Sequence, residues 1–423
     1  MNVGVIIGRI GGVDGVALET EKWITVLNRM GRKVFVLSGQ YEDREMNADT
    51  EELLYDLSFF SPECLWEQSQ AFFQPVKDPT PLMEHIETKS DSISKEIIVW
   101  ILKNKINLLV VENASALPSH ISMGVGIKKA VELLGIKTIT HDHDFAWERG
   151  KRYHSPHKDV NDLIKKTFPL NLPSVVHAVI NTPAQETLKE KFDIYSISVP
   201  NVMDFDIPYG IKTKENKNLP KDIGLGENDM MLFQVTRIVR RKGIEVAIDL
   251  LHKLKNKNLK LVITGNYNDD NDGGYANFLI DKIAELGLKK QVIFGSNFIT
   301  HHIDKNNNGI RYNLSDAYAH AKACTYFSTY EGFGNAFIEA VVARKPIFVN
   351  NYKPVYWPDI GSKGFKTVML ENNNLTDDAI EQIKEIIYNE KLNKEIGEYN
   401  FELGRKYFSY DTLEKKLSDL INL

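Results

Sequence analysis

The chain has 423 residues, which is enough for two or three domains of ordinary size. Hydrophobic residues make up 43% and charged residues 26%, as in globular proteins, which argues against a chain that is disordered throughout. A net charge of -5 gives no reason to expect a nucleic-acid partner, and two cysteines are too few for a disulfide framework. No stretch resembles a transmembrane helix or a secretory signal, so a cytoplasmic protein is expected.

The first half of the chain alternates short apolar runs with segments of helical periodicity. Strands are predicted at residues 3–7, 33–37, 107–111, 137–140 and 177–180, and helices at 17–30 and 120–134. Such alternation predicts parallel sheets that are covered by helices on both faces. Residues 42–95 contain aromatic side chains but no clear period, and no element is predicted there.

A linker with three prolines and the polar run KTKENKN separates this half from the next, at residues 200–229. The alternation then resumes, with strands predicted at 231–236, 259–264, 291–294, 323–328 and 346–349. Helices are predicted at 244–254, 275–286, 335–343 and 377–388, and an amphipathic helix at 412–423. We therefore expect an N-terminal lobe at 1–205, a C-terminal lobe at 206–405, and a final segment, 406–423, that crosses back to the first lobe.

A glycine-rich turn follows the first predicted strand, with the sequence GRIGGVDG at residues 8–15. A turn that enters a helix presents free backbone N–H groups and the positive end of the helix dipole, which suits an anion. The spacing matches neither the dinucleotide-binding fingerprint nor a P-loop. An ordinary tight turn between strand and helix explains the pattern equally well.

Two segments of the second half suggest a phosphate and sugar site. Residues 236–243, TRIVRRKG, place cations after a predicted strand, where charge-assisted hydrogen bonds to a diphosphate contribute roughly 1.5–3 kcal/mol each. Residues 330–340, YEGFGNAFIEA, place Glu331 in a loop and Glu339 in the first turns of a helix that opens with glycines. A solvated basic turn, or two surface glutamates, would be the simpler interpretation of either segment alone.

Together these motifs resemble glycosyltransferase family 4, whose members are retaining enzymes that use nucleotide sugars. The resemblance rests on Glu331-x7-Glu339, on Arg237 and Lys242 upstream, and on the Gly11-Gly12 turn, and it follows nearly the whole chain in order. It implies the α/β fold class called GT-B, with two Rossmann-like lobes whose parallel sheets face a central cleft.

The resemblance also implies residue roles. Catalytic contacts would come from Arg237 and Lys242 on the donor diphosphate and from Glu331 at the donor sugar. Glu339 would hold the ribose, and the remaining donor contacts would be made by Gly12, Gly334, Asn335 and Ala336. The leaving phosphate itself would accept the proton of the acceptor hydroxyl, and no metal or other cofactor is expected.

The segment THDHDFAWER, at residues 140–149, admits several interpretations. A binuclear metal site is rejected because Phe145 stands where an aspartate would be needed, and a metal-binding D-x-D belongs to a different fold. The family resemblance gives His141 a contact with the transferred sugar, with His143 or a purely structural histidine as the alternatives. A calcium loop at 268–273 is rejected because position twelve is Leu279, and His301 and His302 are expected to be a surface pair.

A cluster of cations follows this histidine motif and suits an acidic or phosphorylated acceptor, with Glu148, Arg149 and Arg152 as the bordering residues. A solvated loop is the competing interpretation. The predicted function is transfer of a hexose from a UDP-, GDP- or ADP-hexose to a hydroxyl of a small molecule, glycan or lipid head group. The alternatives are a nucleotide-sugar epimerase, a sugar phosphorylase, or a non-catalytic binding protein. A cytoplasmic location is expected, with peripheral membrane association left open.

Overall fold

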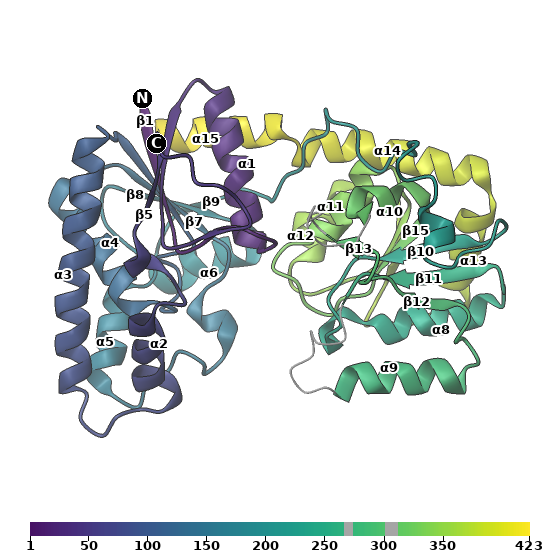
Figure 1. The fold of residues 1–423 in the computed structure, drawn as a ribbon, viewed down its shortest axis with the longest axis horizontal. Helices are drawn as coiled ribbons and strands as arrows, with labels where there is room; N and C mark the ends of the chain where they lie inside the picture. The colour runs from purple at the N-terminus through teal and green to yellow at the C-terminus, as the bar shows by residue number, and fades with distance from the viewer. Residues whose placement is uncertain (266–273, 301–311) are drawn as a thin grey trace. The chain divides into compact units, whose positions relative to one another are not determined.

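A computed structural model describes residues 1–265, 274–300 and 312–423, and the chain divides into two compact units (Figure 1). The first unit contains Met1–Pro200 together with Leu413–Leu423, and the second contains Asn201–Thr412. The residues for which a calcium loop was rejected and the predicted pair His301 and His302 lie outside the described residues.

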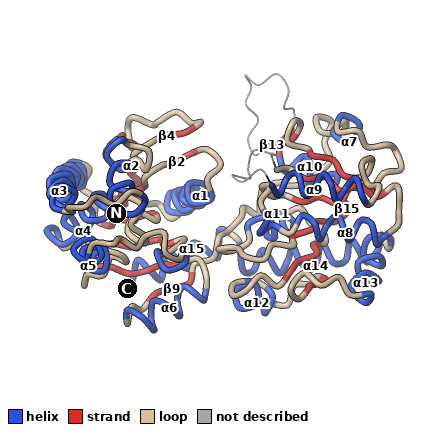
Figure 2. The backbone as a smooth tube through the Cα atoms, turned by 90° about the horizontal axis from the view of Figure 1, so that it is seen from below, coloured by secondary structure: helices blue, strands red, loops and turns tan. Residues whose placement is uncertain are grey.

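A parallel sheet forms the centre of the first unit, with the strand order β5-β3-β1-β6-β7-β8-β9. Its strands are β1 (Asn2–Ile7), β3 (Lys33–Ser38), β5 (Glu51–Leu53), β6 (Leu108–Glu112), β7 (Thr138–Asp142), β8 (Val175–Val179) and β9 (Ser196–Ser198). Two further short strands, β2 (Ile10–Gly11) and β4 (Tyr41–Glu42), pair with each other in parallel and form a separate small sheet. The central strands are buried because helices cover both faces of the sheet, as Figure 2 shows.

The helices of the first unit are α1 (Gly15–Arg29), α2 (Pro62–Gln68), α3 (Thr80–Lys103), α4 (Ile121–Leu134), α5 (Lys158–Thr167) and α6 (Thr182–Phe192). Short helical turns lie at Tyr55–Leu57, Ser69–Phe73 and Ala146–Arg149. The last helix, α15 (Tyr410–Asn422), buries Leu413, Leu417 and Leu420. Its end is tied to this unit by Lys137 Nζ, which donates to the carbonyl of Ile421 at 2.7 Å.

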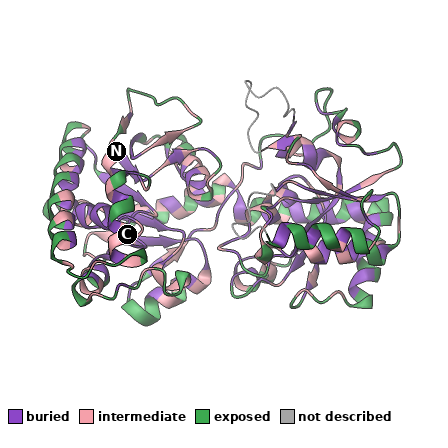
Figure 3. Cartoon of the chain, turned by 60° about the horizontal axis from the view of Figure 1, so that its bottom comes forward, coloured by how far each residue is buried: buried purple, intermediate pink, exposed green. Residues whose placement is uncertain are grey.

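The longest helix of the described chain, α3, begins within residues 42–95, for which the sequence predicted no element, and extends to Lys103. Its buried stripe includes Ser90 and Ser94 among isoleucines, and these two polar residues interrupt the apolar period. The serines are accommodated because α3 packs closely on α4, where a side chain at Gly126 would lie 3.0 Å from the carbonyl oxygen of Ser90. The outer face of α3 is exposed (Figure 3).

The second unit repeats the architecture, with a parallel sheet of order β12-β11-β10-β15-β16-β17. Its strands are β10 (Met230–Gln234), β11 (Leu259–Ile263), β12 (Val292–Phe294), β15 (Ala321–Tyr326), β16 (Ile347–Asn350) and β17 (Val368–Leu370), with a short pair β13 (Ile299–Thr300) and β14 (Tyr312–Asn313). The helices are α7 (Leu219–Asp222), α8 (Ile244–Leu254), α9 (Gly274–Glu285), α10 (Leu314–His320), α11 (Asn335–Val342), α12 (Tyr356–Asp359), α13 (Asp377–Tyr388) and α14 (Glu390–Phe408).

Candidate active site

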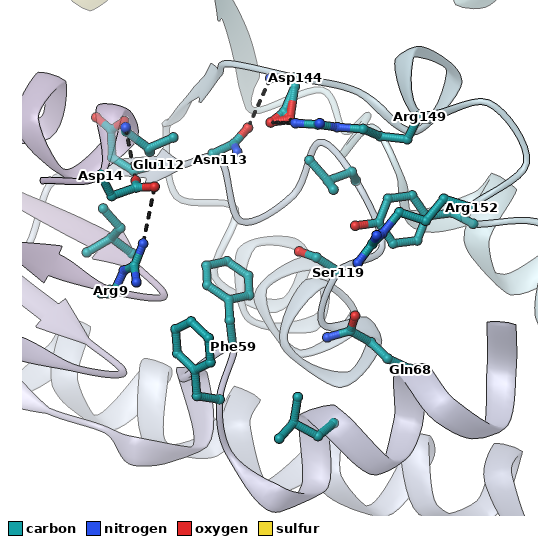
Figure 4. A pocket seen from close by; sticks show the side chains of 16 residues that line it. Arg9, Asp14, Phe59, Gln68, Glu112, Asn113, Ser119, Asp144, Arg149 and Arg152 are labelled. Atoms are coloured by element: carbon teal, nitrogen blue, oxygen red, sulfur yellow. Dashed lines mark hydrogen bonds and ion pairs between the residues drawn. The ribbon is translucent and has the colours of Figure 1, made fainter. Parts of the chain in front are cut away.

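A cavity of about 570 Å³ opens in the first unit at the carboxyl ends of its central strands. Its wall is built from segments that are far apart in the sequence: the residues after β1 and β6, helix α2, and the loop at 149–153. Figure 4 shows Arg9, Arg149 and Arg152 around this cavity, with Phe59 between them. In open α/β sheets ligands bind at the carboxyl ends of the strands, so the position is that of a ligand site.

The cavity is lined by three arginines and by three carboxyl groups, those of Asp14, Glu112 and Asp144, and burial raises the pKa of Glu112. Arg9 forms an ion pair with Asp14 at 3.2 Å, and Arg149 forms one with Asp144 at 2.6 Å. Arg152 has no carboxylate partner among the described residues; its guanidinium lies 5.1 Å from the centre of the Phe73 ring and 5.7 Å from that of Tyr153. Aromatic faces hold a cation in place without neutralising it. The cavity therefore presents one cationic group that is available to an anion.

Two of the three residues predicted at the acceptor site line this cavity, namely Arg149 and Arg152. Glu148 is not among the lining residues. It lies in the short helical turn Ala146–Arg149, and its Oε2 accepts a hydrogen bond from the backbone N–H of Phe145 at 2.7 Å. Its carboxylate thus caps the turn, and this position gives no support to the acceptor-binding role predicted for Glu148.

His141 is fully buried at the end of β7, where it pairs in register with Glu112 of β6. Its Nδ1 lies 2.8 Å from Glu112 Oε2, and its ring stacks on Trp23 of α1 with 4.0 Å between ring centres. Burial lowers the pKa of His141 to about 4, so the imidazole is neutral at pH 7. Burial likewise raises the pKa of Glu112.

His143 follows within the same cluster, and its ring centre lies 4.3 Å from that of His141. The neighbours of His141 in β7 project to the other face of the sheet. There Thr140 Oγ1 lies 2.9 Å from Asp142 Oδ2 and 3.0 Å from His177 Nδ1. Alternation along the strand thus separates a structural histidine, His177, from the two histidines that lie beside Glu112.

In the glycine-rich turn before α1, the N-terminal N–H groups of the helix are bonded to the carboxylate of Asp14. Asp14 caps the helix, accepting hydrogen bonds from the N–H groups of Val16 at 3.0 Å and Ala17 at 3.2 Å. Gly12 is buried at φ 66°, and a Cβ there would lie 2.7 Å from Glu42 Oε2, so glycine is required by the turn itself. This geometry supports the ordinary-turn interpretation of the motif.

The cations of the second unit meet a buried carboxylate at the ends of β10 and β15. Lys242 Nζ lies 2.5 Å from Glu331 Oε1, and Arg241 Nη1 lies 3.0 Å from Glu331 Oε2. Burial opposes the ionisation of Glu331, yet Lys242 and Arg241 hold its pKa below the usual value. Arg237 is exposed and lies close enough to act on the charge of Lys242, so this cluster holds three cations and one carboxylate and has a positive surplus. Arg241 was missed because the sequence pattern gave no reason to choose it over its neighbours.

Helix α11 starts beside this cluster with no side-chain cap. Gly334 has φ 141°, and a Cβ there would lie 2.2 Å from the hydroxyl oxygen of Tyr352. Only glycine fits, and the turn leaves the first backbone N–H groups of the helix, at Asn335 and Ala336, without a side-chain cap among the described residues. Glu339, on the second turn, accepts a hydrogen bond from the hydroxyl of Tyr318 at 3.1 Å.

Comparison with known proteins shows which family the chain belongs to. Residues 215–403 match the model for group 1 glycosyl transferases. A mannosylglucosylglycerate synthase from Thermotoga maritima is 31% identical, over 99% of each chain, and one from Petrotoga mobilis is 28% identical, over 96% of this chain and 98% of the other. The chain belongs to glycosyltransferase family 4.

The prediction of the family is therefore confirmed, and this glycosyltransferase is an enzyme of the hexosyltransferase class. Its fold class is also confirmed as GT-B, since the crystal structure of a glycosyltransferase from Rickettsia africae superposes with a TM-score of 0.67 over 99% of this chain and 97% of the other, at 14% identity. Among the described residues of the enzyme, no helix has the length and apolar character needed to cross a membrane.

Several residues of the glycosyltransferase's cavity were not predicted from the sequence. Arg9, Phe59, Gln68 and Glu112 come from four different segments, and only the fold brings them together. Arg9 carried the one available signal, because it stands in the glycine-rich turn at the end of the first strand. Phe59 and Gln68 lie in the segment 42–95, which has no clear period, and Glu112 ends a predicted strand but belongs to no motif.

Proposed function

We propose that this glycosyltransferase transfers a hexosyl residue from a nucleoside diphosphate sugar to a hydroxyl of a small acidic acceptor, with retention of the anomeric configuration. The names of the two full-length relatives suggest the acceptor class, a glucoside of glyceric acid, and mannose as the sugar that is transferred. Because the identity extends over almost the whole of both chains, it includes the lobe that carries the cavity.

The observation that carries the proposal is Arg152, a cavity arginine without a carboxylate partner among the described residues. The other two arginines have carboxylate partners, whereas the guanidinium of Arg152 is close to two aromatic rings. The carboxylate of an acidic acceptor would give Arg152 an ion-pair partner. Arginine suits this role, because its planar donors match the two oxygens of a carboxylate.

The size and lining of the cavity fit a glycoside as well as an acid. Its volume of about 570 Å³ lies within the usual range of small-molecule sites, roughly 300–1,000 Å³. Phe59 and Tyr153 offer apolar faces to the C–H groups of a sugar ring, while Gln68 and Asn113 offer hydrogen bonds to hydroxyls. This mixture of aromatic, amide and cationic groups is suited to a glycoside that carries one negative charge.

On the donor side, charge develops on the diphosphate as it departs. We assign its stabilisation to Lys242 and Arg237, as the family resemblance implies, and add Arg241, which the structure places beside the same carboxylate. The free N–H groups at Asn335 and Ala336 would add the positive end of the α11 dipole. With these groups the diphosphate needs no added Mg²⁺.

The remaining donor contacts belong to the same proposal. Glu339 would bind the ribose hydroxyls, and Glu331 would orient Lys242 and Arg241 while it faces the donor sugar. The donor contacts that the family resemblance implies for His141 and Gly12 stay predictions, because His141 is buried and Gly12 lies in the turn that Asp14 caps.

The experiment that tests the function is nucleotide release over a panel of UDP-, GDP- and ADP-hexoses. Each donor is incubated alone, with glucosylglycerate, and with glucosylglycerol, a neutral analogue without the carboxylate. We expect one donor to be consumed rapidly, and only with the acidic acceptor. Equal rates with the neutral analogue would refute the acceptor class, and release independent of any acceptor would refute transfer.

A further inference from the structure

Tyr318 is a buried tyrosine of the second unit that contacts the carboxylate of Glu339. It lies in α10, which directly precedes β15, and only 1% of its surface is exposed. Its hydroxyl oxygen is 3.1 Å from Glu339 Oε2 and 3.4 Å from the carbonyl oxygen of Ala336, on the preceding turn of α11. A phenol has a single proton to donate, so the nearer carboxylate oxygen is its acceptor. Tyr318 thus fixes one oxygen of Glu339.

Aromatic neighbours hold the ring of Tyr318 in place. Phe233 of β10 meets it edge to face with 5.1 Å between ring centres, and the ring centre of Tyr209 lies 5.7 Å away. A side chain packed in this way stays in one rotamer, so the position of its hydroxyl is set by the core. Burial and the nearby Glu339 carboxylate raise the pKa of Tyr318 well above its usual value. The hydroxyl therefore keeps its proton at neutral pH and remains a hydrogen-bond donor.

Glu339 is the kind of side chain that gains from such a contact. It stands on the second turn of α11 and is only partly buried, so packing alone does not fix its carboxylate. A glutamate has many rotamers, and holding it in one of them before a ligand arrives lowers the entropic cost of binding. A carboxylate that accepts one bond from a tyrosine can still accept bonds from two adjacent sugar hydroxyls, because its two oxygens offer about four lone-pair positions.

We propose that Tyr318 is a positioning residue, whose hydroxyl orients the carboxylate of Glu339 for the ribose hydroxyls of the donor nucleotide. The inference rests on the proposed function in one respect, because it takes Glu339 as the ribose ligand. It adds that part of the preference for a ribonucleotide comes from a side chain that does not touch the nucleotide. No sequence motif indicates this role, since Tyr318 lies 21 positions before Glu339 and reaches it only through the fold.

The test measures nucleotide binding by isothermal titration calorimetry, with GDP, UDP and ADP as probes and with the 2′-deoxy form of each. The wild-type enzyme should bind at least one of the three, and its 2′-deoxy form at least about tenfold more weakly, since a bond to a charged group is lost. Tyr318→Phe keeps the ring and removes the hydroxyl. It should reduce this preference at least about threefold, while the affinity for the 2′-deoxy form changes less than about twofold.

Two further variants place the effect at Glu339. Tyr312→Phe is the matched control, because the Tyr312 hydroxyl also donates to a carboxylate of the same unit, at 2.7 Å from Asp222 Oδ2. This variant should keep the wild-type preference for the ribonucleotide. Glu339→Ala should abolish the preference, and adding Tyr318→Phe to it should change nothing further, because both residues act through one contact.

The outcomes separate this inference from the proposed function. An unchanged preference in Tyr318→Phe, or an equal loss of affinity for the ribose and 2′-deoxy forms, would overturn the inference alone if Glu339→Ala abolishes the preference. Equal binding of both forms by the wild type, a preference that survives Glu339→Ala, or no binding of any of the three nucleotides would overturn the inference together with the proposed donor site. If Tyr318→Phe does not fold, Tyr318→Met takes its place, since it also lacks the hydroxyl and methionine adapts to irregular spaces.

Discussion

The substitution Arg152→Gln tests how the acceptor is recognised. Arg152 lies in the cavity without a carboxylate partner among the described residues, and its guanidinium is close to the rings of Phe73 and Tyr153. A hydrogen bond to a charged group contributes about 1.5–3 kcal/mol, so the KM for an acidic acceptor should rise roughly 10- to 150-fold. The kcat at saturating acceptor should change little, because the contact is present before and during the reaction.

The assay measures nucleotide release at a fixed, saturating donor concentration while the acceptor varies. Two controls sharpen it. Arg149→Gln removes a half-exposed cation that already pairs with Asp144, so its effect should correspond to about 1 kcal/mol or less. The methyl ester of the acceptor lacks the charge and should be used equally well by wild type and Arg152→Gln. An equal loss for the acid and the ester would refute carboxylate recognition by Arg152, and so would a larger effect at Arg149.

Three further predictions concern the donor site and the fold. Lys242→Ala should lower kcat/KM by about 2–4 kcal/mol, by analogy with the loss of one oxyanion donor, and transfer at the wild-type rate would contradict the diphosphate assignment. Gly334→Ala should cost on the order of 1–3 kcal/mol of unfolding free energy, measured by urea denaturation, because φ is 141° and the new Cβ would meet Tyr352; unchanged stability would contradict the strain. Although burial raises the pKa of Glu67, the neighbouring imidazoles of His120 and His85 and the hydrogen bonds from Ser122 lower it to about 2, so its contribution of on the order of 2–3 kcal/mol is complete above pH 5 and disappears as the pH falls toward 2. Glu67→Gln should therefore make the free energy of unfolding less dependent on pH between pH 5 and pH 2. An unchanged pH dependence would contradict this account.

The sequence predicted those parts of the enzyme in which function follows short-range spacing. The segment from Glu331 to Glu339 lies on one loop and the helix that follows it, so the sequence alone places these residues in order. Five strands of each sheet were predicted because buried parallel strands are continuous apolar runs, whereas the three-residue strands β5, β9 and β17 were missed. Helix α3 was missed because Ser90 and Ser94 interrupt its apolar stripe.

The acceptor side was harder to predict because it depends on tertiary structure. Glu148 was chosen for its closeness to the arginines in the sequence, but the helical turn directs its carboxylate back to the N–H of Phe145. Glu112 could not be found, because only the pairing of β6 with β7 brings it beside His141. The ion pairs of the cavity could not be predicted from the sequence either, since the ion pair of Arg9 with Asp14 depends on how the turn folds.

The most direct test of the central claim is the identity of the product. The enzyme is incubated with glucosylglycerate and the donor selected from the panel, and the product is analysed by mass spectrometry and by NMR of the anomeric proton. We expect glucosylglycerate enlarged by one hexosyl unit, with the anomeric configuration of the donor sugar. A product of inverted configuration, or free hexose as the only product, would contradict retaining transfer to an acidic acceptor.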